Sequence, residues 1–454
     1  MTPVNAGERL ARFVAGTDRV PDDALLQAKR CLLDTLGVAL AGSREESART
    51  VARWLGDQGG RPEASVLGRT LRLPAADAAL ANGTAAHALD FDDVSRPMRG
   101  HPSAPLLPAV LALGEAAGSS GRDLLTAFAL GFEVEAKLGR AIGGAHYALG
   151  WHATSTLGAL GAAAACARLL RLDAGRAQTA LGIAASLASG LQQNFGSMTK
   201  PLHAGWAARS GVVAAQLAAR GLTAGAEAIE GPSGFLRAMS GGAGPDLAPF
   251  EALGQPFEIV SPGVGVKLYP CCYATHRAVD AVLELRAAHG IEPVGVARVR
   301  VEVNRGGLMP LRAEPPATGL EAKFSLEYCL AAALLDGRLG LSSFADEAVR
   351  RPAVSELMAK VKAGEGEEAA EFPIGGYAEG RIALSDGSEY GTRVDVPRGD
   401  PSRPLSWDDL AAKFRDCAAG LLSAEAREQA LALVEGLEDL ADVTGLATAV
   451  VGEQ

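Results

Sequence analysis

The sequence predicts a mainly helical protein with two domains, a large helical domain and a smaller α+β domain. Apolar residues follow helical spacing up to about residue 260, and almost nothing alternates with a period of two in that part of the chain. Strict alternation then appears in Ala297–Val303 (ARVRVEV) and again in Arg381–Val396, where Asp386–Gly387 fits the turn of a hairpin. The length of 454 residues agrees with two or three domains.

The first half of the chain is expected to form helices around a large core. Pro21–Ala41 begins with a proline and two aspartates, which suit the positive end of a helix dipole, and Gly42 ends it. Small residues dominate Leu157–Leu170 and Gln178–Leu191, so the neighbouring helices must approach these segments closely. Further helices are predicted at about 45–57, 75–90, 105–117, 122–140 and 200–220.

The second domain combines strands with helices. Between its strands we predict two helices and a solvated loop, at about 319–335, 344–362 and Gly364–Ala370. Ser406 and Asp409 then form a capping-box pattern, which begins helices predicted near 407–420 and 423–437. Because these last helices have no strand to pair with, we expect them to return to the first domain. The predicted domains are residues 1–265 with 401–454, and residues 266–400.

Charge and cysteine content exclude several classes of function. The formal net charge is −10 and no basic run occurs, so nucleic acid is not an expected partner. None of the six cysteines belongs to a CxxC motif, which argues against a zinc site, and scattered thiols are typical of a reducing compartment. The N-terminal segment carries an early acid and no long apolar run, so we predict a cytoplasmic protein without a signal peptide.

Two charge-free runs, Ala141–Ala167 and Ala177–Thr199, are long enough to span a bilayer. They are rich in alanine and glycine rather than leucine and isoleucine, and they contain histidine, glutamine and asparagine. We therefore interpret them as buried helices of a soluble core and expect no membrane association.

The stretch Ala81–Pro108 contains a cluster of residues that can transfer protons, three carboxylates (Asp90, Asp92, Asp93) and two histidines (His87, His101). Prolines and a glycine after the acids rule out one continuous helix. Acids at a helix end should therefore face a loop that carries a histidine, an arrangement that presents a general base beside a general acid. The alternative is an N-cap cluster with a surface histidine.

Other polar residues stand where helical packing does not require them. His152 lies inside the first charge-free run, where a core histidine with satisfied hydrogen bonds is the alternative. Lys200 follows the second run at a helix start, where it either snorkels or holds an anionic ligand. Lys267 and His276 flank a proline turn at the domain boundary, and Tyr328 follows in EAKFSLEYCLA. No phosphate-binding loop and no HxH or HxxxH pair occurs, so neither a nucleotide nor a metal is predicted.

Taken together, these stretches resemble the MmgE/PrpD family, which includes 2-methylcitrate dehydratase, cis-aconitate decarboxylase and an iminodisuccinate epimerase. The resemblance covers nearly the whole chain in one order, through LDTLGVALAG, NGTAAHALDFDD, GHPSAPLLPA, GWHATSTLG, TKPLHAGWAARSG, EGPSGF, VKLYPCCYATH, KFSLEY and GDPSRPLS. It implies a helical domain built from both chain ends, a smaller α+β lid domain, a pocket between the domains, a homodimer, and no metal or organic cofactor.

The resemblance also implies a set of site residues. Six positions carry the residue type that the family motifs have there, namely Asp90, His101, His152, Lys200, His276 and Tyr328. The loop VSRPMRG departs from the decarboxylase-like pattern, which is shorter and has an extra histidine, because Arg96 and Arg99 occupy it here. This departure argues against cis-aconitate itself as the substrate.

We therefore predict a cofactor-independent lyase, a dehydratase or decarboxylase, that abstracts a proton beside a carboxylate of a small polycarboxylate. Histidine can hold or release a proton near neutrality, and cations would stabilise the added negative charge. The predicted roles are His101 or His152 as base, His276 as acid at the opposite face, and Asp90 as the residue that orients a histidine. Tyr328 would donate a hydrogen bond to a carboxylate, and the substrate-binding cations would be Lys200, Arg96, Arg99 and Lys267. The alternatives are an epimerase or isomerase of a related amino dicarboxylate, and a non-catalytic binding protein.

Overall fold

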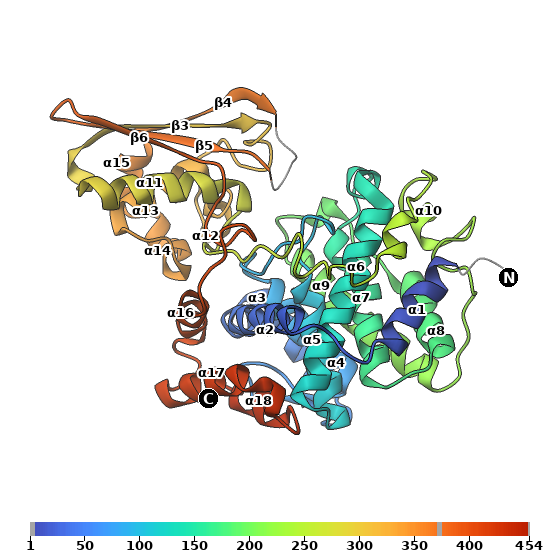
Figure 1. The fold of residues 1–454 in the computed structure, drawn as a ribbon. Helices are drawn as coiled ribbons and strands as arrows, with labels where there is room; N and C mark the ends of the chain where they lie inside the picture. Colours follow the sequence, from blue (N-terminus) through green and yellow to red (C-terminus); the bar gives the residue numbers. More distant parts are fainter. Residues whose placement is uncertain (1–4, 370–374, 453–454) are drawn as a thin grey trace. The chain divides into compact units, whose positions relative to one another are not determined.

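The computed structural model describes residues 5–369 and 375–452 and divides the chain into two compact units (Figure 1). Unit 1 takes the chain up to Gly265 together with everything from Ser406 onward, and unit 2 is Val266–Leu405. Unit 1 is built almost entirely of helices, whereas unit 2 combines helices with a four-stranded sheet. The fold class predicted from the sequence, a helical domain with an α+β domain, is confirmed.

Unit 1 is organised around helices that are rich in alanine and glycine. Helix α9 packs against both α4 and α7, and α5, α6 and α2 surround these helices. The long helices of this unit are α1 (Ala6–Gly16), α2 (Asp22–Gly42), α3 (Glu46–Gln58), α4 (Ala75–His87), α5 (Ser103–Ala117), α6 (Gly121–Ala148), α7 (Ala153–Leu169), α8 (Ala174–Leu187), α9 (Thr199–Ala219), α16 (Trp407–Ala418) and α17 (Ala424–Glu435). Its shorter elements are β1 (Ala64–Ser65), β2 (Arg72–Leu73), α10 (Phe235–Met239) and α18 (Thr444–Ala449).

Glycines let the central helices approach to backbone contact. A Cβ atom placed on Gly205 of α9 would lie 2.3 Å from the Leu80 carbonyl oxygen of α4, and one placed on Gly83 would lie 2.7 Å from the Cα of Gly205. Residues with side chains would hold these two helices further apart. The small residues therefore determine how close α4, which ends at His87, lies to α9, which begins at Thr199.

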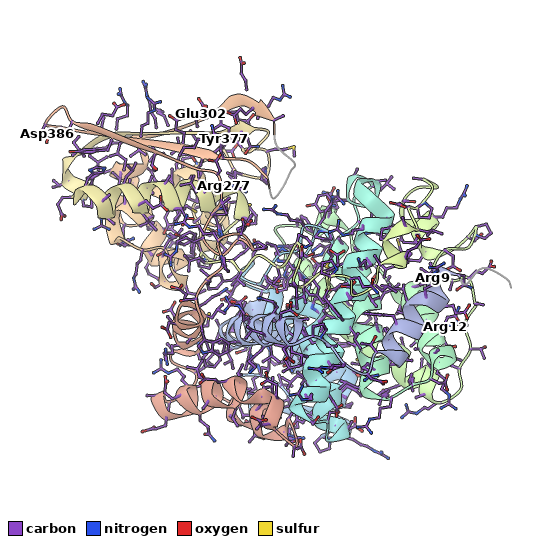
Figure 2. All side chains as sticks on the ribbon, in the orientation of Figure 1. Arg9, Arg12, Arg277, Glu302, Tyr377 and Asp386 are labelled. Atoms are coloured by element: carbon purple, nitrogen blue, oxygen red, sulfur yellow. The ribbon has the colours of Figure 1, made fainter. Side chains whose placement is uncertain are left out.

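Unit 2 contains a mixed sheet with strand order β4-β3-β5-β6. β3 (Val296–Arg305) pairs in parallel with β4 (Val361–Ala369) and antiparallel with β5 (Ala378–Leu384), which pairs antiparallel with β6 (Glu389–Val394). Tyr377 donates a hydrogen bond to Glu302 at one end of this sheet, and Asp386 lies in the β5–β6 turn at the other end (Figure 2).

The helices of unit 2 cover one face of that sheet. Helix α11 packs on β5 and β6, and α13 packs on β4 (Figure 1). The valines of β3 that alternate with polar residues, such as Val299, Val301 and Val303, point into the buried core. The helices of this unit are α11 (His276–His289), α12 (Gly319–Ala322), α13 (Leu326–Asp336), α14 (Asp346–Val349) and α15 (Pro352–Met358).

Three predicted segments of the second domain were wrong. Residues 364–369 of the expected loop belong to β4, an edge strand held by backbone pairing to β3, and Ala370 lies outside the described residues. The helix expected at 344–362 is broken into α14 and α15, because Pro352 begins a new helix and the chain enters β4 at Val361. The helix expected at 319–335 is interrupted after Ala322, and Ser325 caps a second helix.

The two charge-free runs differ in the structure. The first forms the end of α6 and the buried helix α7. The second is not one buried helix, because α8 ends at Leu187 and an irregular segment with exposed Leu191 and Met198 follows. Among residues 5–369 and 375–452, no helix has both the length and the hydropathy needed to cross a membrane.

Candidate functional site in unit 1

The loop between α4 and α5 carries the acids of the DFDD motif and returns to bring His101 next to them. Helix α4 ends at His87, and Asp90 has a left-handed backbone conformation with φ of 53°, which is uncommon for a residue other than glycine. A backbone bridge between Ser95 and Gly100 closes the turn that follows, and α5 begins at Ser103. The loop therefore reverses direction between the acids and the histidine.

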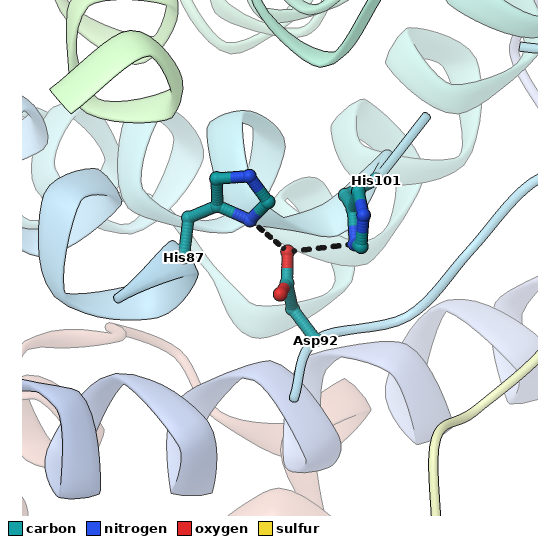
Figure 3. Close-up of side chains that lie close together, drawn as sticks. All are labelled: His87, Asp92 and His101. Atoms are coloured by element: carbon teal, nitrogen blue, oxygen red, sulfur yellow. Dashed lines mark hydrogen bonds and ion pairs between the residues drawn. The ribbon is translucent and has the colours of Figure 1, made fainter. Parts of the chain in front are cut away.

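Asp92 lies between two imidazole rings (Figure 3). Its Oδ2 atom is 2.7 Å from Nδ1 of His87 and 3.2 Å from Nδ1 of His101. The side chains of Asp92 and His87 are fully buried, whereas that of His101 is 14% exposed. Of these three, His101 is the one that solvent or a ligand can reach.

Asp90 and Lys200 form an ion pair beside His101. The Lys200 Nζ atom lies 2.5 Å from Oδ1 of Asp90, and the same oxygen is 3.8 Å from Nε2 of His101. Both members of the ion pair are about as exposed as His101, and Lys200 also lies 5.5 Å from the centre of the Phe195 ring. A cation, a carboxylate and an imidazole thus meet at a partly open position.

His152 forms a second histidine pair behind this position. Its Nδ1 atom is 3.0 Å from Nδ1 of His203, so one ring must donate the hydrogen bond and the other must accept it. The His152 ring stacks on His87 with centroids 5.5 Å apart, and it makes a T-shaped contact with the Phe195 ring. His152 is buried, and it contacts the site through these neighbouring rings.

Burial and neighbouring charges set the protonation of this group. Burial alone would raise the pKa of Asp92, but His101 and His87 outweigh it and hold that pKa well below its usual range. Burial lowers the pKa of His87 to about 4 even though Asp92 acts against it. Burial, followed by the charges of His87 and Lys200, lowers the pKa of His152 far below its usual value. Asp92 is therefore ionised at neutral pH, while His87 and His152 are neutral.

The two arginines of the loop lie on the turn that Ser95 and Gly100 close. Arg96 is exposed, and Arg99 is half-buried with a left-handed backbone, φ being 54°. They belong to the same loop as Asp90 and His101, and their role as substrate-binding cations stays a prediction.

Lys267, His276 and Tyr328 belong to unit 2, where all three are buried. His276 begins α11, its Nε2 lies 3.4 Å from the Cys271 carbonyl oxygen, and its Nδ1 has no hydrogen-bond partner in the part of the chain that the structure describes. The Tyr328 hydroxyl donates a hydrogen bond to the carbonyl oxygen of Ser343. The structure thus brings Asp90, His101, His152 and Lys200 together within unit 1, and the predicted roles of the unit 2 residues stay predictions.

Sequence reasoning left four members of the unit 1 group without a role, namely His87, Asp92, His203 and Phe195. His87 and Asp92 stand in the stretch that drew attention first, but nothing in their spacing showed which acid faces an imidazole. His203 follows Lys200 by three residues on α9, so the two share one helix face, and this spacing would have identified it.

His87, Asp92 and His101 also present possible metal ligands, with one atom from each lying within 4.8 Å of the others. The distance of 2.7 Å between His87 and Asp92 is that of a charge-assisted hydrogen bond from an imidazole to a carboxylate. Hydrogen bonding therefore accounts for this part of the arrangement without an ion.

Comparisons with known proteins agree with the motifs. The model of the MmgE/PrpD N-terminal domain matches residues 8–248, and that of the C-terminal domain matches residues 269–439. Cis-aconitate decarboxylase of Homo sapiens is 33% identical over 96% of this chain and 91% of its own length, and that of Mus musculus is 33% identical over 97% and 92%. Cis-aconitate decarboxylase of Aspergillus terreus is 29% identical over 95% of this chain and 92% of its own length.

The two family domains follow each other along the chain, and the relatives align over nearly its whole length. The chain belongs to the MmgE/PrpD family and is an enzyme of the lyase type.

Proposed function

We propose that this enzyme removes carbon dioxide or water from a small polycarboxylate without a cofactor, and that decarboxylation of an unsaturated tricarboxylate is the reaction to test first. The observation that carries the proposal is the convergence of Lys200, Asp90 and His101 at a partly exposed position, with 2.5 Å and 3.8 Å between the atoms concerned. The names of the relatives, cis-aconitate decarboxylases, support decarboxylation.

Lys200 has the position of a substrate anchor in this proposal. A substrate carboxylate would share the ammonium group that Asp90 now contacts, and the fixed cation would stabilise the negative charge that develops during the reaction. Arg96 and Arg99 would supply charge for a second carboxylate. Because they stand where the decarboxylase-like pattern has a histidine, the substrate panel must include acids other than cis-aconitate.

His101 is the proposed proton-transfer group, because its imidazole is more exposed than those of His87 and His152. In a decarboxylation, the bond from carbon to the departing carboxylate breaks, its electron pair stays on the substrate, and the histidine gives a proton to carbon. In a dehydration, the neutral histidine removes the proton and the hydroxyl group leaves as water after a second acid protonates it. Decarboxylation therefore requires protonated His101 and dehydration requires the neutral form.

The test is proton NMR of the purified enzyme in D2O with 2-methylcitrate, cis-aconitate, citrate, malates and iminodisuccinates. We expect a decarboxylated product with one deuterium on carbon, or new vinyl signals if water is eliminated. Deuterium exchange at the α carbon without a new product skeleton would show an epimerase instead. The absence of any change with the whole panel would contradict the proposal.

Replacement of Lys200 provides the matching residue test. Lys200→Ala should lower kcat and raise KM, with a loss of tenfold or more in kcat/KM, equivalent to about 1.4 kcal/mol or more of transition-state stabilisation. Lys362→Ala is the control, since Lys362 is exposed on β4 of unit 2. Kinetics of Lys200→Ala that match those of the control would remove Lys200 from the site.

A further inference from the structure

We propose that Asp92 is the positioning residue of this site: its carboxylate fixes the orientation and tautomer of His101, and His87 holds that carboxylate from the other side. The catalytic role of this arrangement rests on the proposed function. Which ring nitrogen of His101 carries the hydrogen does not depend on it.

Two imidazoles face one oxygen atom of Asp92. Oδ2 of Asp92 lies 2.7 Å from Nδ1 of His87 and 3.2 Å from Nδ1 of His101, and both approaches are drawn in Figure 3. An ionised carboxylate can accept hydrogen bonds but cannot donate them. Nδ1 of His87 therefore carries the hydrogen of its bond to Oδ2, which leaves the lone pair of that neutral ring on Nε2. Nδ1 of His101 lies at ion-pair distance from the same oxygen without being aligned for a hydrogen bond in the described structure, and the negative charge of the carboxylate favours a hydrogen on this nitrogen over one on Nε2.

The other ring nitrogen of His101 faces the proposed substrate position. Its Nε2 atom lies on the side of Asp90, 3.8 Å from Oδ1, where Lys200 also ends. The nitrogen that exchanges a proton is thus the one that faces the proposed substrate position, and the nitrogen that faces Asp92 keeps its proton throughout.

His87 is too enclosed to transfer protons to a substrate itself. His87 is 1% exposed, its ring contacts those of His101 and His152, and its Nε2 has no hydrogen-bond partner in the described part of the chain. A ring enclosed in this way cannot exchange protons with a substrate directly. Its short hydrogen bond to Asp92 instead prevents the carboxylate from rotating away from His101.

Asp93 provides a matched control, because it is equally buried and follows Asp92 directly in the chain. Its carboxylate accepts hydrogen bonds from the backbone N–H of Ser103, at 3.1 Å, and from the Ser103 hydroxyl. No described contact joins it to an imidazole. Asp93→Asn therefore changes a buried acid of the same motif without altering the contacts of Asp92 with His87 and His101.

The experiment reads the tautomer of His101 from long-range proton–nitrogen NMR spectra of the uniformly ¹⁵N-labelled enzyme without substrate, with His101→Gln used to assign the ring. We expect the Nδ1–H tautomer in the wild type and in Asp93→Asn, and a shift towards the Nε2–H tautomer in Asp92→Asn. His87→Gln should keep the wild-type tautomer to a greater extent than His87→Leu, because a glutamine amide can still donate to Asp92.

Kinetics supply the second readout. Asp92→Asn should lower kcat/KM by about tenfold or more, because His101 is no longer held in the tautomer that presents Nε2 to the substrate. A purely structural effect of the substitution would lower the amount of active enzyme and leave the tautomer of His101 unchanged. Asp93→Asn should leave that tautomer unchanged as well.

Three results would overturn the inference. They are a wild-type His101 that carries its proton on Nε2, a tautomer that is unchanged in Asp92→Asn, and a stoichiometric metal ion in the purified enzyme that is lost in Asp92→Asn. If Asp92→Asn does not fold, the wild-type spectrum and the two His87 variants still decide the matter. Because the spectra need no substrate, they stand even if none of the polycarboxylates is turned over.

Discussion

Asp92 and Asp93 are neighbours in the sequence, yet their surroundings shift the pKa values of their carboxyl groups in opposite directions. The histidines that face Asp92 hold its pKa well below the usual range, despite its burial. Burial raises the pKa of Asp93 to about 7, the negative charges of Asp34 and Asp92 add to that effect, and the hydrogen bonds from Ser103 oppose it. The DFDD motif therefore contains one carboxyl group that is ionised at neutral pH, Asp92, and one that titrates near neutral pH, Asp93.

This difference predicts how stability depends on pH. The folded pKa of Asp93 lies above its ordinary value of 3.8, so its contribution to stability is complete below that pH and is lost as the pH rises through about 7. Between pH 5 and pH 8 the loss should amount to about 2 to 3 kcal/mol. Asp93→Asn cannot titrate, so the difference in unfolding free energy between wild type and variant should change over this range.

Urea unfolding followed by tryptophan fluorescence measures this change for unit 1 alone, because all four tryptophans, Trp54, Trp151, Trp206 and Trp407, belong to it. Other groups also titrate here, among them Asp34 and Glu135, whose pKa values burial raises, and the buried histidines, whose pKa values it lowers. Groups that do not interact with Asp93 act in both proteins and cancel in the difference. Glu135 does interact with it, because the charge of Asp93 helps to raise the Glu135 pKa, so the difference reports Asp93 together with this coupling. Parallel stability curves for wild type and Asp93→Asn would contradict the prediction.

At the scale of single residues, the sequence predicted the location of the site better than the contacts between its side chains. The acids of the DFDD motif were expected to face a histidine, and Asp90 was expected to orient it. The structure places Asp92 at hydrogen-bond distance from an imidazole and pairs Asp90 with Lys200. The left-handed backbone at Asp90 changes the direction of the chain at that point, and residue spacing gives no indication of it because such conformations occur at single positions.

At the scale of elements, the contact between α4 and α9 is what brings His87 close to the face of α9 that carries Lys200 and His203. Density of small residues predicted close helix packing, but not which helices would meet. The segments that were missed have other causes. The charged sequence of β4 resembles a loop, and only pairing with β3 makes it a strand.

The glycine contact yields a prediction at this scale. Gly205→Ala places a methyl group 2.3 Å from the Leu80 carbonyl oxygen and 2.4 Å from the Thr84 hydroxyl, so α4 and α9 must separate. We expect unit 1 to lose about 1 to 3 kcal/mol of stability, and kcat/KM to fall because Lys200 moves away from the α4–α5 loop.

Gly445→Ala is the control, since that glycine lies in helix α18 with no atom within 4 Å of the added carbon. It should be neutral or slightly stabilising, because alanine favours helix more than glycine does. Urea unfolding and steady-state kinetics of both variants check the prediction. Equal effects of the two substitutions would mean that the helices tolerate a wider separation.

At the scale of the whole molecule, unit 1 depends on a chain segment that follows unit 2. Ser406 caps α16 in a capping box with Asp409, as the sequence predicted, and α16 packs against α2 near the beginning of the chain. The return of this segment could be expected because its helices have no strand partner. The contacts it makes at the site could not, since they join residues that are more than 300 positions apart.

Lys413 of α16 makes those contacts. Its Nζ atom lies 2.6 Å from Oδ1 of Asp34 on α2, donates to the Phe91 carbonyl oxygen at 2.9 Å, and sits 3.7 Å from the centre of the Phe91 ring. Both charged side chains are almost completely buried. Phe91 separates Asp90 from Asp92, so the lysine holds the backbone from which both carboxylates of the site project.

Lys413→Met should therefore destabilise unit 1 by about 3 to 5 kcal/mol, because it leaves the Asp34 carboxylate buried without its cation. Asp34→Asn combined with Lys413→Met should recover much of that stability, since no unpaired charge remains, yet it should not recover full activity, because Phe91 still lacks its hydrogen bond.

Arg415→Ala is the control on the same helix: its partner Glu428 is exposed, so the cost should stay below about 1 kcal/mol. Fluorescence-detected unfolding and kcat/KM distinguish the two effects of Lys413. A double variant that regains both stability and activity would show that the lysine only balances the charge of Asp34, whereas stability without activity would show that the C-terminal segment also shapes the site.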